Sequence, residues 1–176
     1  LHGNASGLST NMARGMGEGR SDFYARALVS DASEPVNGLY TVGGWATKQL
    51  GANFESYYYG IRKFPYAVMT SVGANGRPHN PMTFADIDIT QSNFTDGAFD
   101  PNPVVGVGVN RDQVHEIGQI WAMMLLEVRA RFITRLGFAE GNRRILQFVT
   151  DGMKGDPVGP TMLQARDSII AAANAG

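Results

Sequence analysis

A stripe of apolar residues between positions 114 and 136 constrains the fold of this chain more than any other feature of the sequence. Apolar side chains recur there at every third or fourth position, the spacing that places them on one face of an α-helix. Gly137 follows the stripe, and glycine suits the left-handed conformation that often closes a helix. We therefore predict a long amphipathic helix over residues 114–136. The face expected to be buried carries Trp121, Leu125, Val128 and Phe132.

Further helical patterns lie on both sides of a long irregular stretch. The spacing predicts helices over residues 16–29, 139–153 and 161–173, and weaker, shorter ones over 41–50 and 82–87. Prolines recur between residues 51 and 110 and exclude long helices there. Irregular stretches of this length are usually functional or packed on a partner. The expected fold class is mainly α, a helical lobe with long irregular loops.

Composition narrows the classes of function. The 176 residues carry 15 Lys and Arg against 16 Asp and Glu, so the net charge of −1 gives no electrostatic case for a nucleic acid or an anionic membrane as partner. We find no apolar run of the roughly 18 residues that a membrane span needs. Because the chain has no cysteine, any metal ion must be held by His, Asp or Glu.

The segment GMGEGRSDFYA, residues 15–25, places two carboxylates on one face of a predicted helix. Glu18 and Asp22 are four residues apart, and like charges at this spacing disfavour each other unless a cation lies nearby. One interpretation is a metal ligand with a second carboxylate that orients a ligating histidine. The other is a solvated helix face on which Asp22 pairs with Arg26. Spacing alone leaves both open.

The segment RDQVHEIGQIWA, residues 111–122, opens the long predicted helix. Asp112 is expected to cap this helix, and His115 follows in its first turn, where Asp112 is placed to fix the imidazole tautomer. The zinc-binding pattern His-Glu-x-x-His fails here, because its fifth position is Gln119. His115 is therefore either a structural residue of the first turn or a catalytic one.

Seven segments together resemble the second half of the catalytic domain of fungalysin-type zinc metallopeptidases, which are relatives of the thermolysin group. They occur in the order of the family across nearly the whole chain. The segments are GNASGLSTNMARGMGEGRSDFYARAL, YTVGGWATKQLG, YYYGIRKFPYA, NPMTF, VHEIGQIWAMML, GNRRILQFVTDGMK and PTMLQARDSIIAA.

The resemblance implies a zinc cofactor and gives roles to residues of both segments. Glu18 maps onto the third zinc ligand, and Asp22 onto the carboxylate that hydrogen-bonds a ligating histidine. His115 maps onto the transition-state histidine, with Asp112 as its orienting carboxylate.

Arg62, in the segment GIRKFPY, resembles an arginine that holds the substrate backbone beside the metal. Tyr59, from an aromatic run that faces either a ligand or the loop, joins it as a substrate-binding candidate.

Two departures from the family pattern stand beside these matches. The family's His-Glu-x-x-His helix, which supplies two zinc ligands and the general base, is expected upstream of Leu1. Arg20 stands where the family usually has tryptophan. We can assign no role to the insertion over residues 88–110.

The resemblance implies that residues 1–176 are the C-terminal part of the catalytic domain of a secreted, extracellular zinc metalloendopeptidase. The expected partners are the N-terminal part of the same catalytic domain and a protein or peptide substrate. The alternative is a non-catalytic helical module for binding or packing that lost the zinc-binding helix.

Overall fold

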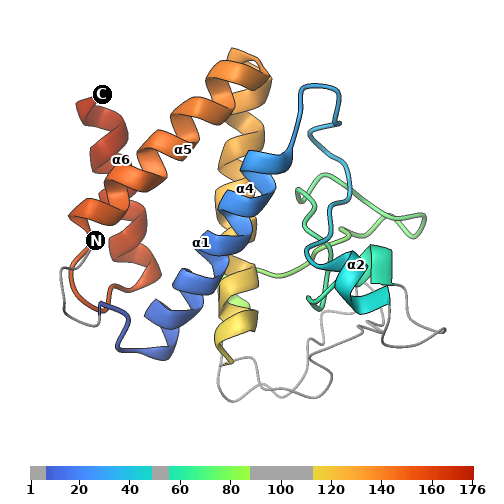
Figure 1. Ribbon diagram of the computed structural model, residues 1–176, viewed down its shortest axis with the longest axis horizontal. Helices are drawn as coiled ribbons and strands as arrows, with labels where there is room; N and C mark the ends of the chain where they lie inside the picture. Colours follow the sequence, from blue (N-terminus) through green and yellow to red (C-terminus); the bar gives the residue numbers. More distant parts are fainter. Residues whose placement is uncertain (1–6, 49–55, 88–112) are drawn as a thin grey trace.

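The computed structural model describes residues 7–48, 56–87 and 113–176 (Figure 1). Within these ranges the chain is mainly helical, as predicted. The long helices are α1 (Asn11–Val29), α4 (Val114–Leu136), α5 (Phe138–Gly155) and α6 (Met162–Ala175). Three short ones, α2 (Gly44–Thr47), α3 (Ser56–Tyr59) and the 3₁₀ helix η2 (Phe84–Asp86), interrupt the loops between α1 and α4.

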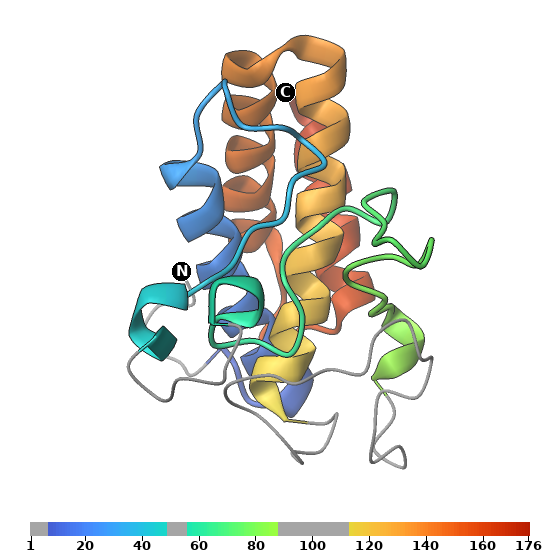
Figure 2. The same ribbon diagram turned by 90° about the vertical axis from the view of Figure 1, so that its right-hand side faces the viewer.

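The helices and loops occupy opposite sides of the molecule. Helix α1 lies against α4, and α5 and α6 continue the helical layer to one side, while the loops between α1 and α4 lie on the other (Figures 1 and 2). Two isolated antiparallel bridges, Tyr40 with Tyr66 and Val72 with Pro78, tie these loops together. The described residues contain no helix long and apolar enough to cross a membrane.

The helix boundaries follow local capping chemistry. Helix α4 has the predicted bounds, and Gly137 ends it with a positive φ of 81°, although its ψ of 163° lies outside the left-handed helical region. Helix α1 begins five residues before the predicted start, because the Thr10 side chain accepts a hydrogen bond from the Ala13 N–H at 3.1 Å. The loop helices α2 and η2 are shorter than predicted.

Helices α1 and α4 meet at glycines, so their backbones touch. A Cβ atom added to Gly19 would lie 2.2 Å from the carbonyl oxygen of Gly118, and one added to Gly118 would lie 2.8 Å from the carbonyl oxygen of Gly15. No larger residue fits at these positions without moving a helix. This contact fixes the distance between the middle of α1 and the first turns of α4.

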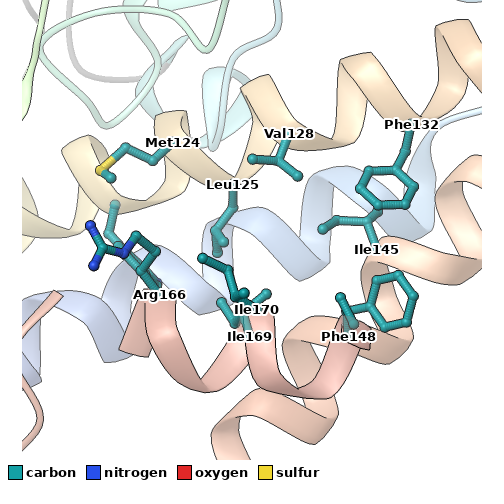
Figure 3. A pocket seen from close by; sticks show the side chains of 11 residues that line it. Met124, Leu125, Val128, Phe132, Ile145, Phe148, Arg166, Ile169 and Ile170 are labelled. Carbon is teal, nitrogen blue, oxygen red and sulfur yellow. The ribbon is translucent and has the colours of Figure 1, made fainter. Parts of the chain in front are cut away.

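The predicted buried face of α4 is confirmed at Trp121 and Leu125, which are 1% and 4% exposed. Phe132 is half-buried, and Val128, at 39% exposed, contradicts the prediction. Val128 lines an apolar hollow of about 250 Å³ between α4, α5 and α6, which leaves one side of that residue uncovered. In Figure 3, Ile169 and Ile170 of α6 face Leu125, while Phe132 and Phe148 lie at one end and Arg166 at the other.

Candidate functional site

The glycine contact brings Glu18 of α1 to His115 of α4. The Oε2 atom of Glu18 lies 3.7 Å from Nε2 of His115, and the two side chains are 43% and 48% exposed. Both groups therefore face solvent from adjacent helices, although 97 positions separate them in the sequence. The pair presents one carboxylate and one imidazole at the same surface.

Gln113 determines which nitrogen of His115 carries the proton. It is the N-cap of α4, and its Oε1 accepts a hydrogen bond from the His115 backbone N–H at 2.7 Å. Its Nε2 then lies 2.6 Å from Nδ1 of His115. An amide nitrogen only donates, so Nδ1 accepts, and the neutral ring carries its hydrogen on Nε2, the atom that faces Glu18.

The cap of α4 is therefore Gln113, and the expectation that Asp112 would cap this helix is wrong. The side chain at position 113 reaches back to the N–H of residue 115, which satisfies one of the donors left free at a helix start. Asp112 lies outside the described residues, so its predicted role in orienting His115 stays a prediction.

Asp22 lies one helical turn beyond Glu18 and is buried, only 5% exposed. Its carboxylate accepts two hydrogen bonds from Arg62, from Nε at 2.6 Å and from Nη2 at 2.9 Å, and a third from the Tyr66 hydroxyl. The solvated-face interpretation is wrong for Asp22, since Arg26 pairs instead with Glu34. This network joins two of the site candidates, Asp22 and Arg62.

The buried network shifts the pKa values of its members. Burial lowers the pKa of Arg62, but the hydrogen bonds and charge of Asp22 outweigh burial and raise it overall. Burial and the Asp22 carboxylate raise the pKa of Tyr66 well above its ordinary value. Arg62 therefore stays charged and Tyr66 stays protonated, so both remain donors to Asp22.

Gln119 anchors the loop that carries Arg62. It is 1% exposed, its Oε1 accepts from the Lys63 N–H at 3.2 Å, and its Nε2 donates to the Phe64 carbonyl at 2.8 Å. A helix side chain thus pairs with the loop backbone much as a neighbouring strand would. Its hydrogen bonds explain why a glutamine stands on an otherwise apolar helix face. In the sequence, this polar residue within the apolar stripe was the signal that could have identified the role of Gln119.

Tyr59 lies at the end of the short helix α3 and is 5% exposed. Its ring packs edge-on against Tyr58, with the ring centres 4.7 Å apart. The Tyr59 carbonyl accepts a hydrogen bond from the Arg62 N–H at 3.1 Å, which closes the turn that presents the arginine side chain. The two substrate-binding candidates are therefore parts of one turn.

Arg20, at the position where the resemblance leads us to expect tryptophan, is buried on α1 and forms an ion pair with Asp156, the C-cap of α5. Arg20 is 7% exposed and Asp156 8%. This pair connects α1 to the end of α5. The substitution thus places a charged pair between two helices.

The side chains at this site can provide one ligand to a zinc ion. Zinc accepts carboxylate oxygen, and the half-exposed Glu18 carboxylate can supply it. Among residues 7–48, 56–87 and 113–176, no three His, Cys, Asp or Glu side chains are grouped to hold a metal ion. A catalytic zinc site has three protein ligands. The described residues therefore do not make up a complete site of this kind.

Sequence comparison decides the family. A family model described as "Fungalysin metallopeptidase (M36)" matches residues 2–176. The chain belongs to this family. Its membership confirms the resemblance found in the sequence segments, and it makes a metal ion the cofactor class of the family.

Curated relatives agree with this assignment. The chain is 32% identical over 183 residues to "Extracellular metalloproteinase 9" of Uncinocarpus reesii, a match that covers 96% of this chain and 23% of the relative. It is 30% identical over 182 residues to "Extracellular metalloproteinase 2" of Trichophyton rubrum, with the same coverage of both chains. The chain therefore spans about a quarter of the length of these relatives.

Proposed function

We propose that residues 1–176 are the C-terminal part of the catalytic domain of a secreted, extracellular zinc metalloendopeptidase. The approach of Glu18 to His115, 3.7 Å between a carboxylate oxygen and an imidazole nitrogen, carries this proposal. These are the two positions to which the family resemblance gives a zinc ligand and a transition-state histidine. The names of the curated relatives agree with an extracellular metalloproteinase.

Each site residue has a role that its contacts support. Zinc, when bound, supplies the Lewis acid that polarises the peptide carbonyl. Glu18 offers one carboxylate ligand. His115 donates from Nε2 to the negative charge that develops on the carbonyl oxygen, and Gln113 holds the ring in the required tautomer.

Arg62 and Tyr59 border the backbone of a protein or peptide substrate in this proposal. The rigid pairing of Arg62 with Asp22 supports it, because a guanidinium already held in place loses little freedom when a substrate binds. Asp22 in turn orients a zinc-ligating histidine from the N-terminal part of the same catalytic domain. That part would carry the His-Glu-x-x-His helix with two further ligands and the general base. Asp112 keeps its expected role beside His115.

The test compares carboxylate-to-amide variants in the complete protein. Glu18→Gln should lower the zinc content after dialysis well below one ion per molecule, while Asp22→Asn should cost about 10–100-fold in zinc affinity or activity. The matched control is Asp167→Asn on α6, a carboxylate 62% exposed and remote from the site, which should change neither quantity. Full zinc content and activity in Glu18→Gln would remove this residue from the metal site.

His115→Ala separates catalysis from metal binding. The variant should retain zinc and lower kcat by about 10²–10³-fold, the usual loss for one donor to an oxyanion. Residues 1–176 alone should bind zinc weakly in a calorimetric titration and hydrolyse no casein, because they supply one family ligand. A complete protein that binds zinc yet cleaves no peptide would favour the alternative, a non-catalytic helical module.

A further inference from the structure

A small hollow lies behind the Asp22 network, between α1, α4 and the loops. It measures about 20 Å³ and is open to solvent on one side. This exceeds the 10–15 Å³ that one water molecule needs. Its lining combines the side chains of Arg26, Tyr40, Tyr66 and Arg129 with small and apolar residues of the loops and of α4.

Two arginines that line the hollow are almost completely buried. Arg26 and Arg129 are each 8% exposed, and each comes from a different long helix. Burial lowers the pKa of Arg129, and the charge of Arg26 lowers it further, which shows that the two guanidinium groups repel each other. Both stay protonated, because an arginine does not lose its proton in a protein.

Among the described residues, a single carboxylate forms an ion pair with one of these two guanidinium groups. Glu34 pairs with Nη2 of Arg26, and Glu34 is 30% exposed and is not part of the lining. Arg129 donates to neutral acceptors, to Asn142 Oδ1 at 2.6 Å and to the Ser30 hydroxyl. Within the part of the chain that the structure describes, the arginine pair therefore keeps one positive charge that no carboxylate balances.

Arg26 also has one hydrogen-bond donor that no described residue accepts. Its guanidinium carbon lies over the Tyr40 ring, 3.4 Å from the ring centre, and its Nε is buried with no hydrogen-bond partner among the described residues. A buried charged donor without a partner is costly. An anion in the hollow would balance the excess charge of the two guanidinium groups.

We propose that the hollow between Arg26 and Arg129 is a binding site for a small inorganic anion of the size of chloride. Chloride is only slightly larger than water, so it fits a hollow of this volume. The site is separate from Glu18 and His115. It adjoins the Asp22 network, because Tyr66 lines the hollow and donates its hydroxyl hydrogen to Asp22.

Thermal unfolding of the 176-residue chain tests the proposal in solution. Chloride is exchanged for methanesulfonate, a larger anion, at constant ionic strength. Tm should rise saturably with chloride, by about 3–6 °C at ten times the dissociation constant. This shift should vanish in Arg26→Gln and Arg129→Gln. The matched control, Arg143→Gln on α5, removes an arginine that is 64% exposed and should keep the shift.

Crystals grown with bromide in place of chloride give a readout that needs no variant. Bromide should give an anomalous peak between the guanidinium groups of Arg26 and Arg129. Absence of that peak at a bromide concentration that saturates Tm would overturn the proposal. The same holds if methanesulfonate raises Tm as chloride does, or if both glutamine variants fold and keep the full shift.

Discussion

The backbone contact between α1 and α4 predicts an unusually costly substitution at Gly19. A Cβ atom there would lie 2.2 Å from the Gly118 carbonyl oxygen, 3.0 Å from the Gly118 carbonyl carbon and 3.1 Å from the Ala122 nitrogen. All three obstacles are backbone atoms of α4, so no rotamer change relieves them. To restore ordinary contact the helices must separate by roughly 1 Å.

The expected free-energy change for Gly19→Ala has two opposing parts. Overpacking costs about 1–3 kcal/mol, and the upper end applies because the obstacle is rigid. Alanine in place of glycine inside a helix recovers about 1 kcal/mol. The variant should therefore be destabilised by about 2 kcal/mol, with a lower urea midpoint when unfolding is followed by circular dichroism.

Gly17→Ala on the same helix is the matched control. Its added Cβ would meet one atom within 4 Å, the Leu8 Cδ1 at 2.9 Å, which is the movable end of a side chain. It keeps the gain in helix propensity, so its stability should be unchanged or about 1 kcal/mol higher. If Gly19→Ala proves as stable as Gly17→Ala, the backbone contact does not limit the approach of the two helices.

Three further measurements probe the buried network and the surface charges. Gln119→Ala should lower the free energy of unfolding in urea by about 2–3 kcal/mol, because it removes two buried hydrogen bonds to the loop backbone. Arg20→Leu should cost about 3–5 kcal/mol in the same assay, and Asp156→Leu in the same chain should recover most of it. Hydrogen bonds from Arg143 and its neighbour lower the pKa of Glu140 from 4.5 to about 2. Its stabilising contribution is complete above pH 4.5 and is lost as pH falls towards 2; an NMR titration should find the midpoint near 2, and Arg143→Gln should raise it.

Helix positions were predictable from the sequence because they follow local periodicity. The bounds of α4 agree with its apolar repeat, and α5 and α6 begin and end within two residues of their predicted limits. Val128 shows where this reasoning stops. It belongs to the apolar stripe, but its exposure depends on how α6 packs against α4. The sequence of α4 alone does not predict that packing.

Site residues on single segments were predictable, but most of their partners were not. Glu18 and His115 were candidates from local patterns and from the resemblance, and the structure brings them together. One of the two interpretations paired Asp22 with Arg26, four residues away, whereas its partner in the structure is Arg62, 40 residues away. Helix spacing describes only neighbours along one helix, so a pairing through a loop escapes it.

The ion pair of Arg20 with Asp156 has a consequence for how the chain is made. The two residues are 136 positions apart, and α4 and α5, which cover α1, also follow it by a long interval. A ribosome adds about 5–20 residues per second, so Asp156 is synthesised about 7–27 s after Arg20. Until α4 is made α1 lacks the helix that covers its glycine face, and until Asp156 is made Arg20 lacks its ion-pair partner. The helix that carries Glu18 is therefore synthesised before α4, α5 and α6, all of which contact it in the folded protein.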